Sequence, residues 1–262
     1  YFTAFYIKVQ RYKKVLLFLL CYALFRIFAK NKLNWNSKRT MKKPLLLLSI
    51  LIFAVSAFGK DYTLSTPNTS LILSAEEGKI LYFRYYGSRA KADDIRAAGR
   101  MLEYEAYPAF GTRCDAPYAS LVKQHDGDNS VKLVVEKVEQ SNNNGIEKLT
   151  FSLRDVAHPT LLVKVNYSAY SDCDIVKMNT EYINEGKKPV VLQKYMSAVL
   201  PIQSDNCVLL HLDGTSKNEF NEHIEPLSNG VKIISTQAGS QVSKHVNASF
   251  MLGLDGRLDE SN

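Results

Sequence analysis

Short runs in which apolar and polar residues alternate fill this sequence from Asp61 onward, and they constrain the fold more than any other feature. An alternation with a period of two places every second side chain on one face of an extended chain, as in a strand buried on one side. β-branched and aromatic residues are frequent in these runs. The predicted strands are 69–73, 80–85, 120–123, 131–138, 147–153, 161–168, 175–184, 190–200, 207–212, 231–235 and 249–254. Such a series predicts an all-β fold, a large antiparallel β-sandwich.

Turn-forming residues separate many of these runs. The expected turns are Asp126-Gly127-Asp128-Asn129, Asn142-Asn143-Asn144-Gly145, Asn184-Glu185-Gly186, Asp213-Gly214 and Asn229-Gly230. Asn, Asp and Gly tolerate the backbone angles that tight hairpins require. One short helix is expected over 92–102, a stretch rich in Ala and Arg but interrupted by Gly99. Strands and helices do not alternate, which argues against a parallel nucleotide-binding sheet.

A basic, apolar segment precedes the alternating region. Met41, Lys42 and Lys43 are followed by an apolar run over 45–58 and by small residues at Ala57 and Gly59. A charged start, an apolar stretch of this length and small residues at its end are typical of a secretory signal peptide. We therefore predict a signal peptide over 41–59 and an exported protein, periplasmic or extracellular.

Residues 1–40 do not begin with Met and are rich in residues that AT-rich codons encode, so we interpret them as non-native upstream translation. The alternative is a membrane helix over 15–29. That stretch contains Arg26 and is shorter than the roughly 20 residues that cross a bilayer, so no stable membrane span is expected. The remaining residues, 60–262, are expected to form one domain that is incomplete at its C-terminus.

The formal net charge of +7 is positive only because of the first 59 residues. They hold eleven of the 33 Lys and Arg residues and no Asp or Glu, so the rest of the chain has 22 basic and 26 acidic residues, a net charge of −4. The expected folded part has no basic stripe interleaved with aromatic residues. Nucleic-acid binding is therefore not expected.

Neither a metal site nor a cofactor site is indicated. The four cysteines, Cys21, Cys114, Cys173 and Cys207, form no C-x-x-C pair, and no two of the five histidines have H-x-x-x-H spacing. Asp126 and Asp128 superficially resemble the start of a calcium loop, but Val131 replaces its essential glycine. No phosphate-binding glycine loop is present. We expect no bound cofactor.

Carboxylates and aromatic rings are the groups that could handle sugars. Glycoside hydrolysis needs two carboxyl groups on either side of the scissile bond, and the spacing of the acids nominates no such pair. Eight aromatic residues cluster between Tyr82 and Tyr118. Alternation buries about half of such a set, so core packing is one interpretation of these rings. The other is an aromatic sugar-contacting loop that includes Tyr107, Phe110 and Tyr118.

Several segments in order resemble the N-terminal domain of the family-36 glycoside hydrolases, the α-galactosidase family. The most specific are Tyr107-Pro108-Ala109-Phe110-Gly111, Ala116-Pro117-Tyr118-Ala119 and His125-Asp126-Gly127-Asp128. Further similar segments are Leu81-Tyr82-Phe83 with Tyr86-Gly87, then Tyr182-Ile183-Asn184-Glu185-Gly186, Leu212-Asp213-Gly214 and Asn247-Ala248-Ser249-Phe250. Together they cover nearly all of residues 61–262.

The resemblance implies a β-sandwich that precedes a (β/α)₈ barrel, in which two aspartates hydrolyse terminal α-galactosides with retention of configuration. Both aspartates would lie beyond Asn262, so no catalytic residue is expected in this chain, and galactoside binding would occur mainly through the missing barrel. In the family, a carboxylate from the 107–118 region can reach the sugar, sometimes in a neighbouring subunit. Asp115 is its expected counterpart, and a homo-oligomer is a corresponding expectation.

Two other functions fit the same sequence. A stand-alone exported sandwich could bind carbohydrate or mediate adhesion without any barrel. A membrane-anchored structural protein could be held by the N-terminal segment. If the domain is incomplete, we also expect exposed strand edges and apolar surface that promote self-association.

Overall fold

The computed structural model describes residues 59–113, 118–202, 204, 206–228, 230–235, 245–254, 256 and 258. Its strands are β1 (Lys60–Ser65), β2 (Thr69–Ala75), β3 (Tyr82–Ser88), β4 (Tyr104–Glu105), β5 (Leu121–Lys123), β6 (Leu133–Asn143), β7 (Ile146–Asp155), β8 (Leu161–Tyr170), β9 (Val176–Asn184), β10 (Val191–Lys194), β11 (Val208–Thr215), β12 (Asn218–Pro226) and β13 (His245–Gly253). The helix described is α3 (Ala92–Ala97). The predicted antiparallel all-β fold is confirmed. The expected signal peptide and upstream segment lie outside the described residues, apart from Gly59.

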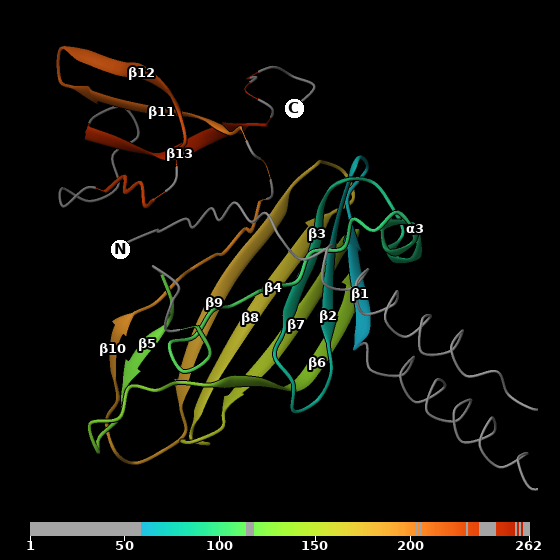
Figure 1. Ribbon diagram of the computed structural model, residues 1–262, viewed down its shortest axis with the longest axis vertical. Helices are drawn as coiled ribbons and strands as arrows, with labels where there is room; N and C mark the ends of the chain where they lie inside the picture. The colour runs from blue at the N-terminus through green and yellow to red at the C-terminus, as the bar shows by residue number, and fades with distance from the viewer. Residues whose placement is uncertain are drawn as a thin grey trace, which may run out of the picture. The chain divides into compact units, whose positions relative to one another are not determined.

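Two four-stranded antiparallel sheets form the sandwich (Figure 1). One has the order β1-β2-β3-β4 and the other β6-β7-β8-β9. Buried residues of both sheets belong to one hydrophobic core, which includes Leu71 and Phe83 from the first sheet and Phe151 and Val165 from the second. Each such side chain contributes roughly 1.5–3 kcal/mol through removal from water, so this core is the main stabilising feature of the domain.

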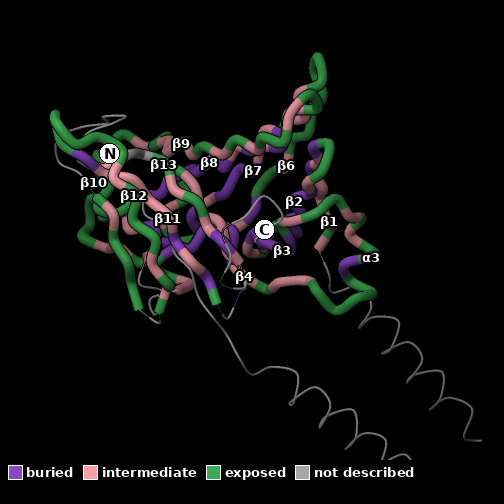
Figure 2. The backbone as a smooth tube through the Cα atoms, turned by 90° about the horizontal axis from the view of Figure 1, so that it is seen from above, coloured by how far each residue is buried: buried purple, intermediate pink, exposed green. Residues whose placement is uncertain are grey.

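Strand β8 shows how the alternation builds this core. Val163, Val165 and Tyr167 are almost completely buried, whereas Lys164 and Asn166 between them are partly exposed on the opposite face. Figure 2 shows buried positions gathered between β7 and β8 on one side and β2 and β3 on the other. The period of two in the sequence is therefore the period of burial in the sandwich.

The hairpin between β6 and β7 confirms one of the predicted turns. Asn143 pairs with Ile146, so Asn144 and Gly145 alone form the connection. Both have positive φ, 51° and 76°. Two such residues in succession are typical of a type I′ turn, whose twist matches that of the flanking strands.

The helix is shorter than the sequence predicted. It ends at Ala97 rather than near Leu102, because Gly99 has a φ of 66° and turns the chain out of the helix. Ile95 is the buried residue of this helix, and it packs with Ile72 and Tyr85 on the side of the first sheet that faces away from the main core.

Two smaller antiparallel sheets complete the described fold: β10 pairs with β5, and β11 lies between β12 and β13. The prediction of a turn at Asp213-Gly214 was wrong, since β11 continues to Thr215 with a register shift there. A glycine inside a strand often marks such a bulge. The strand expected over 231–235 is not formed, and Ile233 within it is 72% exposed. Strands β1, β4 and β12 were missed.

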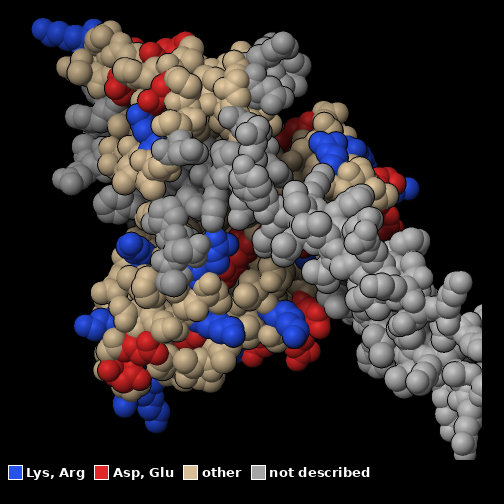
Figure 3. Space-filling view, viewed as in Figure 1, with Lys and Arg blue, Asp and Glu red and all other residues tan. Residues whose placement is uncertain are grey.

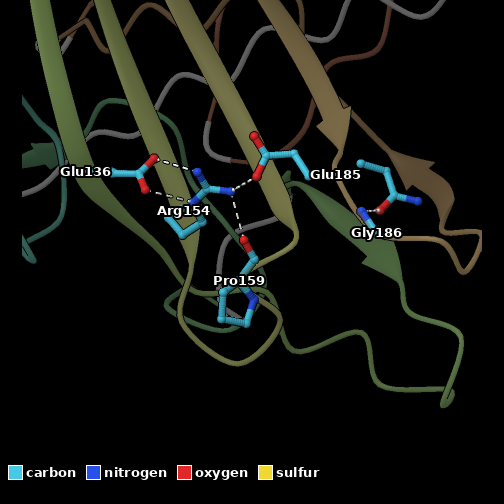
Figure 4. Close-up of polar contacts among 6 residues, drawn as sticks. Glu136, Arg154, Pro159, Glu185 and Gly186 are labelled. Carbon is cyan, nitrogen blue, oxygen red and sulfur yellow. Dashed lines mark hydrogen bonds and ion pairs between the residues drawn. The ribbon is translucent and has the colours of Figure 1, made fainter.

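Arg154 near the end of β7 ties three segments together on the outer face of the sandwich (Figure 4). Its guanidinium donates to both carboxylate oxygens of Glu136 at 3.1 and 2.8 Å, to Glu185 at 2.5 Å and to the carbonyl oxygen of Pro159 at 2.8 Å. A planar guanidinium suits this forked geometry, which a lysine could not reproduce. The contacts fix strand β6, the β7–β8 connection and the end of β9 to one another.

Basic and acidic side chains are interspersed on the face of the molecule shown in Figure 3, without a broad basic area among the described residues there. In the part of the chain that the structure describes, no helix has the length and apolar character that a membrane span requires.

Candidate functional site

The segment that links β4 to β5, residues 105–120, contains every residue that the sequence singled out for sugar contact. We call it the 105–120 loop. Tyr107 and Phe110 lie in its first half and Tyr118 in its second half. Asp115, the expected sugar-contacting carboxylate, lies in the stretch 114–117, outside the described residues.

Backbone hydrogen bonds hold both ends of this loop together. The N–H of Phe110 donates to the carbonyl oxygen of Ser120 at 3.0 Å, and the N–H of Ser120 donates to Pro108 at 2.8 Å. The N–H of Gly111 donates to Val131 at 2.7 Å. A Cβ atom at Gly111 would lie 2.4 Å from that carbonyl oxygen, so only glycine permits this approach. We call residues 108–113 the loop base.

Tyr107 is a core residue. Its side chain is 1% exposed, and its hydroxyl donates to the carbonyl oxygen of Met196 at 2.8 Å. The hydroxyl also lies 2.7 Å from that of Tyr182. The ring therefore has no free face on which a sugar could stack, and it follows the core-packing interpretation of the aromatic cluster.

Phe110 and Tyr118 differ from Tyr107 in exposure. Phe110 is 41% exposed although its backbone is fixed against Ser120, so the ring can offer a face to a ligand. Tyr118 is partly buried and packs against the main core. An exposed aromatic ring on a firmly held backbone is suited to stacking against the apolar face of a sugar.

Glu105 is a buried carboxyl group beneath the loop base that the sequence analysis missed. It is 6% exposed, and the Thr112 hydroxyl lies 2.8 and 3.0 Å from its two oxygens. Burial raises the pKa of Glu105 to about 7, although the hydrogen bond from Thr112, the charge of Arg113 and a backbone hydrogen bond from Ala109 oppose that rise. No sequence signal distinguished Glu105 from an exposed acid.

The hydrogen-bond geometry also favours the protonated form of Glu105. The Thr112 hydroxyl carries one hydrogen but lies within hydrogen-bond distance of three acceptors, since the carbonyl oxygen of Ala109 is also 3.0 Å away. A protonated Glu105 can donate to Thr112, which is then free to donate to Ala109. The loop base thus rests on a carboxyl group that titrates near neutral pH.

The hydrogen bonds described for Glu105 join it to Thr112 and Ala109 and not to a second carboxyl group. A retaining glycosidase needs a second carboxyl group about 5 Å from the first, and Glu105 has no such partner in the contacts described above. No group of three or more His, Cys, Asp or Glu side chains among the described residues is arranged to hold a metal ion.

Comparisons with known proteins agree with this description. The model of the glycosyl hydrolase family 36 N-terminal domain matches residues 79–262. The crystal structure of the α-galactosidase AgaA from Geobacillus stearothermophilus superposes with a TM-score of 0.65 at 19% identity, over 75% of this chain and 32% of that one. A search of curated proteins found no match.

Two other solved structures are similar. The galactosidase domain of the α-galactosidase–sucrose kinase AgaSK gives a TM-score of 0.64 at 21% identity, over 75% of this chain and 32% of that one. The α-galactosidase from Lactobacillus brevis gives 0.60 at 19% identity, over 74% and 31%. These TM-scores show a shared fold, and this chain spans about a third of the length of these relatives. Because the family model matches most of the sequence, the chain belongs to glycosyl hydrolase family 36, of which it carries the N-terminal domain.

Proposed function

We propose that this chain is the non-catalytic N-terminal domain of an exported α-galactosidase. The observation that carries the proposal is the family-36 match over 79–262 together with a sandwich fold shared with α-galactosidases. In this proposal the chain is part of a longer protein, because the similar α-galactosidases are about three times as long as the segment they share with it.

The chemistry would be performed by the remainder of that longer protein. A pair of carboxylic acids in a barrel would act as nucleophile and as general acid and base, with retention of configuration at the anomeric carbon. Related AgaA variants have been crystallised in complex with raffinose and with stachyose. Terminal α-galactosides of that type are accordingly the proposed substrates.

The contribution of the present domain would be the 105–120 loop. Its base is fixed by hydrogen bonds to Ser120 and Val131, which supports a role in presenting the loop in a defined position. Asp115 would contact the sugar, with Phe110 and Tyr118 beside it. Such a loop could act in its own subunit or in a neighbouring one, which is the reason we propose a homo-oligomer.

Export would depend on the predicted signal peptide, residues 41–59, with translation starting at Met41. The test is the N-terminal sequence of the protein recovered from the periplasm or medium of the source organism. A mature N-terminus at Lys60 is expected. Recovery from the cytoplasm with Met41 or an earlier residue retained would contradict export.

The proposed activity is tested with two versions of the protein, one ending at Asn262 and one continued to the natural stop codon. Each is incubated with a chromogenic α-galactoside and with the matching β-galactoside as a control. We expect only the longer version to hydrolyse the α-galactoside. If neither version is active and both bind galactosides, the domain is a carbohydrate-binding sandwich, and the α-galactosidase assignment is wrong.

A further inference from the structure

His158 lies between carboxylates from two separate parts of the chain. It follows β7 in sequence, and its side chain is 16% exposed. Its Nε2 atom is 3.1 Å from Asp126 in the turn between β5 and β6. Its Nδ1 atom is 3.4 Å from Asp155 at the end of β7. The same atom is 4.0 Å from Asp128, which lies in the same turn as Asp126. The two ring nitrogens therefore face carboxylates on opposite sides.

This arrangement favours the doubly protonated ring. A neutral imidazole carries one N–H and could donate to only one of its two carboxylate neighbours, whereas the imidazolium donates from both nitrogens. Asp155 adds to this preference because it is completely buried. One of its oxygens accepts the backbone N–H of Lys132 at 3.0 Å, and the other has no hydrogen-bond partner among the described residues. A buried carboxylate is costly unless a cation lies beside it.

The turn that His158 contacts, residues 124–131, also supports the loop base. Within it, the N–H of Gln124 donates to the carbonyl oxygen of Asp128 at 2.7 Å, and the N–H of Ser130 donates to the Asp128 carboxylate at 2.8 Å. The turn ends at Val131, whose carbonyl oxygen accepts the N–H of Gly111 at 2.7 Å. Because Gly111 packs directly on Val131, a movement of the turn displaces the loop base.

We propose that the imidazolium of His158 is a proton-dependent latch that fixes the 124–131 turn to the end of β7 and, through Val131, positions the loop base. When His158 loses its proton, the contact with Asp155 weakens and the loop base opens more often. His158 is thus a positioning residue, and its role does not depend on the proposed α-galactosidase activity.

The charges around the ring set the direction of the effect. Burial lowers the pKa of His158, but the hydrogen bond and charge from Asp126, followed by the charge of Asp155, outweigh burial and raise it above the ordinary value. Asp128 also faces the ring, and His125 places a further basic group near Asp126. A raised histidine pKa means that the latch is complete below about pH 6.5 and is lost as pH rises through the folded-state value.

The pKa of Asp126 sets the lower pH limit of the latch. A backbone hydrogen bond from Asp128 and the hydrogen bond from His158 lower the pKa of Asp126 below its ordinary value. Its contribution is therefore present above about pH 4 and is lost only as pH falls further, through the folded-state value. The latch should be strongest in the mildly acidic range between these two limits.

Amide hydrogen exchange in the full chain tests the proposal. Protection of the loop base, and of the Gly111 N–H in particular, is measured from about pH 5 to about pH 8.5 and corrected for the intrinsic pH dependence of exchange. We expect protection to fall about tenfold for each unit by which the folded pKa of His158 exceeds that of the unfolded chain. Constant corrected protection across this range in the wild-type chain would overturn the proposal.

Two variants separate the latch from general effects of pH. His158→Gln is combined with Glu105→Gln, which removes the carboxyl group that titrates beneath the loop base, so protection of the loop base should then be low and independent of pH. His125→Gln is the matched control, since it removes an exposed histidine from the same turn and should leave the wild-type profile unchanged. If His158→Gln retains the wild-type pH profile, another group is responsible and the proposal fails. Asp126→Asn weakens the contact between residue 126 and His158 but keeps the His158 side chain. This variant should reduce protection of the loop base in the acidic range.

Discussion

The hydroxyl groups of Tyr107 and Tyr182 lie 2.7 Å apart in the middle of a partly buried hydrogen-bond chain. Tyr107 donates to the carbonyl oxygen of Met196, so its oxygen accepts from Tyr182, which in turn accepts from Ser120 at 2.8 Å. This direction gives both tyrosine hydroxyls a donor and an acceptor role. The chain joins the 105–120 loop to β9 and to the segment that follows β10.

Tyr182→Phe should therefore destabilise the domain although it removes a single oxygen atom. The change leaves the Ser120 hydroxyl, which is completely buried, without its partner. An unpaired buried hydroxyl costs about 1–3 kcal/mol. The measurement is chemical denaturation followed by circular dichroism. Tyr86→Phe is the control, since Tyr86 is 42% exposed and its substitution should change the free energy of unfolding by less than about 0.5 kcal/mol.

Most of the sandwich could be predicted from the sequence because alternation and turn chemistry act locally. Strand β8 and the turn at Asn144-Gly145 illustrate this, since each is specified by its own residues. Strand β12 could not be predicted in this way. Phe220 and Ile224 in this strand are 51% and 56% exposed, so its apolar residues do not mark a buried face. Its position depends on pairing with β11.

The candidate site was less predictable, because its groups depend on contacts between distant residues. Tyr107 and Phe110 belong to the same aromatic cluster in the sequence, yet one is buried and the other is exposed. Glu105 looks like any surface acid until the fold covers it. His158 contacts Asp126 across 32 positions in the sequence, a separation that no local pattern indicates.

Glu105→Gln tests whether the buried carboxyl group makes stability depend on pH. Burial raises the folded-state pKa of Glu105 to about 7, so the folded chain holds its proton more tightly than the unfolded chain. Its stabilising contribution is complete below about pH 4.3 and is lost as pH rises through about 7. Glutamine represents the neutral form at every pH. The variant should accordingly be more stable than wild type at about pH 8, by at most about 4 kcal/mol, with a smaller difference at about pH 5.

The matched control for this experiment is Glu103→Gln, because Glu103 is an exposed acid two residues away. Free energies of unfolding are compared at several pH values for the three proteins. If Glu105→Gln and wild type lose stability in parallel between about pH 5 and about pH 8, Glu105 does not titrate in that range and its burial has been misjudged.

Gly111→Ala should open the loop base. The added Cβ would lie 2.4 Å from the carbonyl oxygen of Val131 and 2.8 Å from its carbonyl carbon, so the backbone must move and the Gly111–Val131 hydrogen bond lengthens. We expect a loss of about 1–3 kcal/mol and faster amide exchange over 108–113. At Gly186 the nearest atoms belong to side chains that can move, at 3.1 Å or more, so Gly186→Ala should have a smaller effect. Equal effects at both positions would refute this account of the loop base.

Arg154→Lys tests whether the forked guanidinium geometry matters. Lysine keeps the positive charge but cannot hold Glu136 with two parallel hydrogen bonds while also reaching Glu185 and Pro159. Because these groups are partly exposed, the expected loss is modest, about 1 kcal/mol. Lys137→Arg on the adjacent strand is the reverse substitution and serves as the control. It should leave the free energy of unfolding unchanged. If Arg154→Lys is as stable as wild type, the positive charge alone is sufficient and the forked geometry makes no measurable contribution.

A row of apolar side chains on one face of the β12-β11-β13 sheet should make the isolated chain self-associate. Ile224 and Met251 both pair with Leu210 in register, so the three side chains share a face, and the outer two are each 56% exposed. Contiguous apolar surface of this kind promotes association. Ile224→Lys should shift the chain toward monomer in analytical ultracentrifugation. Ile233→Lys removes an equally apolar exposed residue outside this row and should have little effect. If both variants associate as strongly as wild type, the contact lies elsewhere, and the outer edges of β12 and β13, which pair with no further strand among the described residues, are the next surfaces to alter.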